Sequence, residues 1–105
     1  MNKFEKEILK AIDDRKAEDI KFYDVRGVNP LCDSIFICTA LNERNLFGIE
    51  NAVEEAAEKL NLKINHIEGR NDSKWVIVDL NDIIVHILTR DERERLALDD
   101  IIKIK

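Results

Sequence analysis

The chain has 105 residues, of which 45% are apolar and 37% are charged, with three Gly and one Pro. This length and composition predict one compact domain over residues 1–105, large enough to bury about 65% of its unfolded surface. The net charge of −5 disfavours direct binding to nucleic acid, because few positive side chains can displace counterions from phosphates. No apolar run reaches the roughly 20 residues of a membrane span and no signal-peptide pattern is present, so we expect a cytoplasmic protein without membrane contact.

Taken in chain order, the apolar pattern alternates between helical and strand spacing and predicts eight elements. Asn2 and Asn42 are typical N-cap residues for the first two helices, and Thr89 and Glu92 form a capping-box pattern for the third. The elements are a helix over residues 3–16, strands over 20–25 and 34–39, a helix over 43–61, a short strand over 63–68, two strands within 74–88 and a helix beginning after Thr89. This order, αββαβββα, predicts the α/β class with a mixed sheet of about five strands flanked by helices.

The most informative segment is K-W-V-I-V-D-L-N-D-I-I-V-H-I-L, residues 74–88, in which two β-branched runs flank an Asn-Asp dipeptide. Asn and Asp tolerate positive φ, so they predict a two-residue hairpin turn that pairs Trp75 with Leu88 and Ile77 with His86. Side chains alternate between the two faces of such a hairpin. One face, here called the inner face, is wholly apolar and predicted to be core: Val76, Val78, Leu80, Ile83, Val85 and Ile87. The other, here called the mixed face, carries Trp75, Ile77, Asp79, Ile84, His86 and Leu88.

Five ionisable side chains form a candidate metal or acid–base cluster: Asp24, Asp33, Asp79, Asp82 and His86. Asp79 and His86 should lie diagonally across the hairpin, close enough to interact. We favour a structural interpretation, in which Asp82 belongs to the turn, Asp33 opens a strand and His86 is hydrogen-bonded on a half-buried face. The sequence lacks an H-E-x-x-H or D-x-D motif, a glycine-rich phosphate loop and a serine nucleophile elbow. We therefore predict no catalytic residue, no metal ligand and no cofactor.

Cys32 and Cys38 are the only cysteines. On one strand their α-carbons would lie about 20 Å apart, beyond the roughly 7 Å that a disulfide spans, and no clustered His accompanies them to suggest zinc. We predict buried, unreactive thiols.

Trp75 is the only tryptophan and lies on the mixed face. Periodicity leaves two interpretations equally open, an ordinary core aromatic or an interface anchor, a role in which Trp is enriched. Phe47 falls outside the apolar stripe of the second helix, which predicts a second exposed aromatic. The Arg/Glu run of residues 90–95 predicts a solvated helix face supported by neighbouring opposite charges.

Three strings resemble the ribosomal silencing factors, also called the Iojap-related family: K-A-E-D-I at residues 16–20, D-V-R-G-V-N-P-L-C-D at 24–33 and W-V-I-V-D-L-N-D-I-I-V-H-I at 75–87. The similarity runs from the first helix to the last. It implies a nucleotidyltransferase-like fold without that superfamily's catalytic residues. It also implies a homodimer that binds the large ribosomal subunit through a basic ribosomal protein on the subunit-joining face, and so keeps the small subunit from docking and lowers translation when nutrients are scarce.

The chain departs from the family's usual residues at Ala40, Asn42, Phe47, Leu80, Asn81, Arg95, Leu96, Ile101 and Ile102, and retains Trp75, Asp79, Asp82 and His86. The residues that we expect to contact the partner are Trp75, Asp79, His86, Lys74, Leu80 and Arg93. Asp79 is expected to accept a charge-assisted hydrogen bond from an Arg or Lys of the partner.

Two alternatives stay open at this point. One is a nucleotide-handling enzyme that uses Asp24, Asp79 and a divalent metal. The other is a dimeric scaffold protein in which the mixed face is the contact between two copies.

Overall fold

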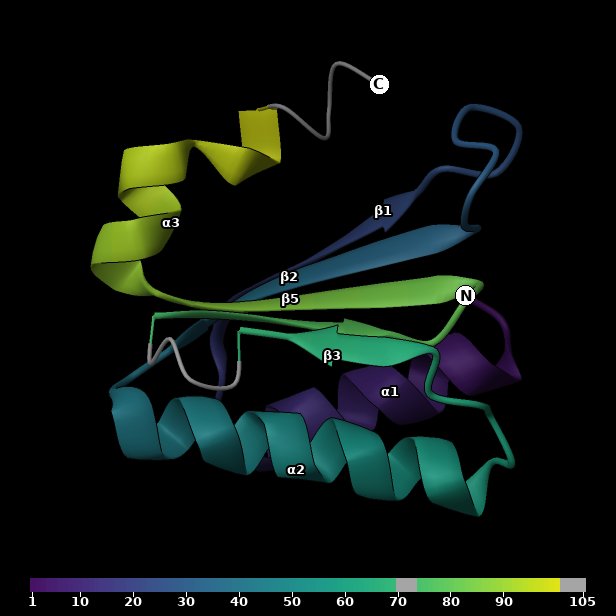
Figure 1. The fold of residues 1–105 in the computed structure, drawn as a ribbon, viewed down its shortest axis with the longest axis horizontal. Coiled ribbons are helices and arrows are strands. Elements are labelled where there is room, and N and C mark those ends of the chain that lie inside the picture. Colours follow the sequence, from purple (N-terminus) through teal and green to yellow (C-terminus); the bar gives the residue numbers. More distant parts are fainter. Residues whose placement is uncertain (70–73, 101–105) are drawn as a thin grey trace.

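The computed structural model describes residues 1–69 and 74–100, which form a five-stranded sheet flanked by helices (Figure 1). The elements are α1 (Lys3–Asp14), β1 (Glu18–Asp24), β2 (Ser34–Ala40), α2 (Glu43–Lys59), β3 (His66–Glu68), β4 (Trp75–Asp79), β5 (Ile83–Thr89) and α3 (Arg90–Leu96). Across the sheet the strands lie in the order β1-β2-β5-β4-β3, with β2 and β5 parallel and the other neighbours antiparallel. The predicted element order and mixed sheet are confirmed.

The helices lie on opposite sides of this sheet. Figure 1 shows α1 and α2 together beneath one face and α3 beyond the other. The main core lies between the sheet and the first two helices, and it includes Ile8, Ile12, Phe36, Leu46, Ile49, Val53, Val76, Val78, Val85 and Ile87. Phe47 is half-buried against this core, so the prediction of an exposed aromatic is wrong. The reason is that α2 touches α1 as well as three strands, which covers more than a narrow stripe of its surface.

The β4–β5 hairpin forms in the predicted register. Trp75 pairs with Leu88 and Ile77 with His86, and the backbone N–H of Leu80 donates to the Ile83 carbonyl at 2.9 Å. Asn81 adopts φ 74°, the left-handed conformation that the turn requires. The inner face is therefore buried in the main core, as predicted.

Several element boundaries differ from the prediction by a few residues. Helix α1 ends at Asp14 rather than at residue 16, and Lys16 has φ 61°. Strand β1 begins at Glu18 rather than at residue 20. A bulge around Asp19 shifts the register, and Glu18 beyond it still pairs with Thr39 of β2. Strand β3 is confined to three residues at the sheet edge. Ile101 and Ile102, two of the positions at which the chain departs from the family's usual residues, lie outside the described residues.

Cys32 and Cys38 are both buried free thiols, in agreement with the prediction. Burial raises the pKa of both, that of Cys38 to about 12, which suppresses thiolate reactivity. Over the two described ranges, no helix has the length and apolar character needed to cross a bilayer.

Candidate interaction face

The mixed face of the hairpin lies on the α3 side of the sheet and stays partly open to solvent. Leu88 is buried, and the other five side chains of this face are half-buried. Leu96 and Leu98, at and just beyond the end of α3, belong to one apolar cluster with Leu88 and Trp75. The chain thus covers one end of the mixed face itself, whereas the inner face is completely buried.

Trp75 is half-buried, between the two states that the sequence left open. Its indole N–H donates to Nδ1 of His86 at 3.2 Å, and the two ring centroids lie 6.0 Å apart. Burial lowers the pKa of His86 to about 4, so the imidazole is neutral near pH 7 and its second nitrogen carries the proton. The neutral acceptor fixes the orientation of the indole, which reduces the entropy that a contact through this ring would cost.

Asp79 interacts with the edge strand rather than with His86. Its carboxylate accepts the backbone N–H of Asn81 at 2.8 Å and lies 3.5 Å from Nδ1 of His66, the residue opposite it on β3. The expected Asp79–His86 interaction is therefore absent. Instead, His86 accepts the hydrogen bond from Trp75, and Asp79 lies beside His66 of β3. The carboxylate ends up at the end of the mixed face farthest from α3.

Lys74 and Leu80 flank β4 but are placed differently. Lys74 is exposed, and its carbonyl accepts the backbone N–H of Thr89 at 2.9 Å. Leu80 is 3% exposed and belongs to the inner core. A partner on the mixed face could reach Lys74, whereas Leu80 supports the hairpin from the other side.

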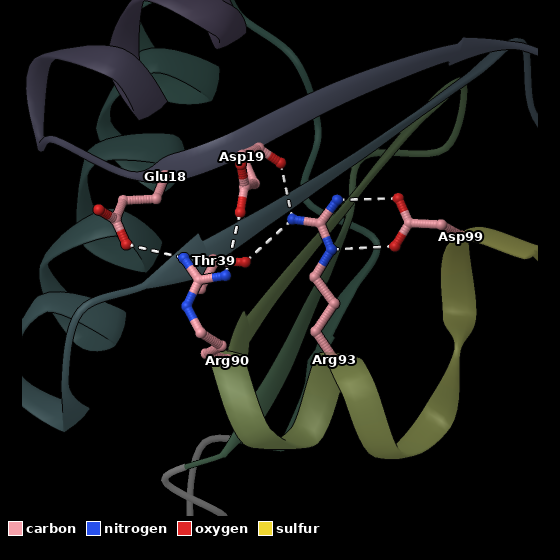
Figure 2. A network of polar contacts seen from close by, with 6 residues as sticks. All are labelled: Glu18, Asp19, Thr39, Arg90, Arg93 and Asp99. Carbon is pink, nitrogen blue, oxygen red and sulfur yellow. Dashed lines mark hydrogen bonds and ion pairs between the residues drawn. The ribbon is translucent and has the colours of Figure 1, made fainter.

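Arg93 lies inside a polar network that joins α3 to the sheet (Figure 2). Its guanidinium donates to both carboxylate oxygens of Asp99 at 2.9 and 2.8 Å, to Thr39 Oγ1 at 2.9 Å and to the Asp19 carbonyl at 2.6 Å. The side chain is only 12% exposed. Arg93 therefore positions α3 and the turn after it, and most of its donors are already used within the chain.

The rest of α3 agrees only in part with the predicted solvated face. Arg90 is exposed and pairs with Glu18 and Asp19 at 3.0 and 3.1 Å. Glu92, by contrast, is buried, and its carboxylate accepts two hydrogen bonds of 2.9 Å from Arg95. The capping box is consequently half formed, because Thr89 accepts the Glu92 backbone N–H at 3.4 Å while the Glu92 side chain is held elsewhere.

Asp33 and Asp82 have the structural roles that we favoured, and Asp24, for which no such role was predicted, forms an ion pair within the chain. Asp24 and Asp33 both face Arg26, at 3.2 and 4.0 Å, Asp33 directly precedes β2, and Asp82 lies in the hairpin turn. Within residues 1–69 and 74–100, no three His, Cys, Asp or Glu side chains are grouped so that they could hold a metal ion.

Sequence reasoning missed Tyr23 and Asp99. The Tyr23 hydroxyl donates to Asp99 at 2.8 Å, and burial, with this bond adding to it, raises the pKa of Tyr23 to about 12. Ala97, with φ 48°, ends α3 and turns the chain so that Asp99 lies beside Arg93. Apolar periodicity carries no signal for such a turn, and the only hint is an Arg and an Asp on either side of the helix end.

A known protein family and solved structures resemble this chain in sequence and fold. The family described as "Ribosomal silencing factor during starvation" matches residues 1–104. The chain is 32% identical to "Ribosomal silencing factor RsfS" of Bacillus subtilis over 90% of this chain and 84% of that protein, and 33% identical to the protein of the same name from Haemophilus influenzae over 88% and 90%. A crystal structure of a Chromobacterium violaceum protein has the same fold, with a TM-score of 0.91 at 23% identity, covering 96% of this chain and 86% of that one. Since the family matches almost the full length and two relatives exceed 30% identity over most of both chains, the chain belongs to the ribosomal silencing factor family.

Proposed function

We propose that this protein represses translation by binding the large ribosomal subunit through a basic ribosomal protein on the subunit-joining face. Bound there, it occupies space that the small subunit needs and so prevents joining by steric exclusion. The protein acts in the cytoplasm, as a homodimer and without catalysis. Membership of the ribosomal silencing factor family supports a role in repressing translation, and the mixed face supports binding to a protein partner.

The observation that carries the proposal is the pre-positioned Trp75 on a half-open sheet face. Interfaces derive most of their binding energy from a few aromatic or Arg anchors in a partly desolvated setting. Trp75 offers such an anchor, and Asp79, at the other end of the face, offers a carboxylate to a basic partner. The net charge of −5 favours encounter with a basic protein over contact with phosphate.

The direct test is sedimentation of the purified protein with isolated large and small ribosomal subunits. We expect it to travel with large subunits and not with small ones. Preincubation of large subunits with the protein should then lower the fraction of joined ribosomes when small subunits are added, in proportion to the fraction of large subunits occupied.

Binding to large subunits without any effect on joining would contradict steric exclusion. Binding to neither subunit would contradict the proposal as a whole. Nucleotide turnover in the presence of a divalent metal ion is measured for the wild type and for Asp79→Asn. Turnover by the wild type that Asp79→Asn abolishes would assign a catalytic role in place of the binding role.

A further inference from the structure

We infer that the β1–β2 loop, residues 25–33, is a second contact point for the basic protein partner, which it meets through Val28 and Leu31. The inference rests on the proposed function, since it adds a surface for the same partner at the opposite end of the mixed face from α3. Nothing in the apolar periodicity of the chain points to this loop.

Val28 and Leu31 are the two most exposed large apolar side chains in the described part of the chain, at 60% and 82%. Isolated apolar residues on a surface are ordinary. Here two of them stand three positions apart on one short loop, with Pro30 beside Leu31. The loop therefore presents an apolar tip rather than a single exposed side chain.

The backbone of the loop is tightly hydrogen-bonded. The N–H groups of Val28 and Asn29 donate to the Val25 carbonyl at 3.1 and 2.9 Å, and the Leu31 N–H donates to the Asn29 side chain at 2.8 Å. Gly27, with φ 77°, supplies the left-handed turn between these bonds. A loop with this many internal bonds holds its tip in one arrangement, so little entropy is lost when a partner covers it.

Arg26 fixes the base of the loop to the rest of the fold. Its guanidinium lies 2.6 Å from the fully buried carboxylate of Glu5 on α1 and 3.2 Å from Asp24. The backbone N–H of Asp33 donates to the Asp82 carbonyl at 2.8 Å, which ties the loop to the hairpin turn. Contacts with α1, β1 and the hairpin turn therefore hold the base of the loop, and with it the apolar tip, in place.

The position and charge of the loop select the partner. Val25 and Cys32, at its base, belong to the same apolar cluster as Trp75 and Ile84, and Figure 1 shows the loop on the α3 side of the sheet at the end away from α3. Segment 24–33 carries two carboxylates against one Arg, with Asp82 beside it. This charge disfavours contact of the loop with phosphate or with the same acidic loop of a second copy, and it favours contact with a basic protein surface.

The test compares the double variant Val28→Ser/Leu31→Ser with wild type and with Leu41→Ser, a control that removes an apolar side chain 55% exposed beyond the other end of β2. Affinity for isolated large subunits is measured for each, together with thermal unfolding and self-association by analytical ultracentrifugation. We expect the double variant to bind at least about tenfold more weakly and Leu41→Ser to bind within about twofold of wild type. The melting temperature should not change, because the removed side chains stand in water.

Equal affinity of wild type and the double variant, with Trp75→Ala weakened, would overturn the loop contact and leave the proposed function standing. Loss of self-association by the double variant at unchanged subunit affinity would assign the tip to a second copy and overturn the inference. Failure of the wild type itself to bind large subunits would overturn the proposed function, and this inference with it.

Discussion

At the scale of single residues, the Trp75–His86 pair links stability and binding in one place. The indole is partly covered by the chain's own cluster with Leu96 and Leu98, and its only polar group is used by His86. A partner can therefore contact the part of the ring that is still exposed, but it cannot accept a hydrogen bond from the indole N–H, which is donated to His86. Trp75 should accordingly act as an apolar anchor whose orientation is set from within the protein.

The first prediction separates the two roles of Trp75. Trp75→Ala should weaken large-subunit binding by about 2–4 kcal/mol. It should lower the free energy of unfolding by about 2 kcal/mol, less than the roughly 3–5 kcal/mol for a fully buried aromatic. Trp75→Phe keeps a ring but removes the donor to His86, so it should retain most of the stability. Urea unfolding and subunit binding on the same samples check both values, and full binding by Trp75→Ala would exclude the anchor role.

The second prediction concerns the pH dependence that His86 creates. Burial lowers the pKa of His86 from 6.5 to about 4. Below pH 6.5, therefore, His86 binds a proton in the unfolded chain but stays neutral in the folded chain. The free energy of unfolding should therefore fall as the pH drops through this window, by about 2 kcal/mol between about pH 7 and about pH 5. Urea unfolding at both values, for wild type and for His86→Gln, isolates the contribution. An identical loss in the two proteins would show that His86 does not cause it.

At the scale of elements, α3 is held by one half-buried arginine, Arg93, and one exposed arginine, Arg90. The hydrogen bonds from Arg93 hold the pKa of the Asp99 carboxyl below its usual value, so this pair favours the ionised carboxylate. The helix has only seven residues and could not be stable alone. Its position on the sheet depends on these side chains and on Leu96 and Leu98.

The third prediction compares the two arginines. Arg93→Met removes four donor contacts and leaves Asp99 with the Tyr23 hydroxyl, so it should lower the free energy of unfolding by about 2–3 kcal/mol. Arg90→Met is the matched control, and it should leave stability nearly unchanged because its ion pairs are exposed. Chemical denaturation measures both. A comparable loss in the two variants would show that burial of the network does not matter.

The fourth prediction concerns the two glycines that have positive φ. A Cβ on Gly69 (φ 84°) would lie 2.1 Å from the Trp75 carbonyl oxygen, whereas one on Gly27 (φ 77°) would meet no atom within 4 Å. Gly27→Ala should therefore cost only the conformational strain, about 1 kcal/mol. Gly69→Ala should cost clearly more, because the start of β4 must shift. Thermal unfolding of the two variants distinguishes these cases, and equal melting temperatures would contradict the steric argument.

The sequence predicted those elements whose burial repeats regularly. The hairpin was predicted to its exact register because strict alternation leaves one way to bury both apolar runs. The bulge at Asp19, the turn at Ala97 and the burial of Phe47 were missed, because each is decided by contacts between distant segments. Trp75 and His86 could be placed on one face from sequence, but their hydrogen bond and the network of Arg93 could not.

At the scale of the whole molecule, the fifth prediction follows from the charge. An acidic chain that binds through a protein makes few phosphate contacts, so affinity for large subunits should fall only modestly as salt rises. Titrations at several salt concentrations give the slope of log affinity against log salt. Naked ribosomal RNA is the control, and it should bind much more weakly than whole subunits. Equal affinity for RNA and subunits would contradict contact through a protein.

The parallel pairing of β2 with β5 also governs how the chain folds. Ser34 pairs with Ile83, so α2, β3 and β4 must all be synthesised between the two central strands. The antiparallel pairs β1–β2, β3–β4 and β4–β5 close shorter loops and can form early. Joining β2 to β5 costs the entropy of a long loop and should limit the folding rate. Until β5 is made, the wholly buried strand β2 has an unpaired apolar edge. A nascent chain that stalls before β5 is therefore at its most prone to aggregate, with its most hydrophobic strand exposed on one side.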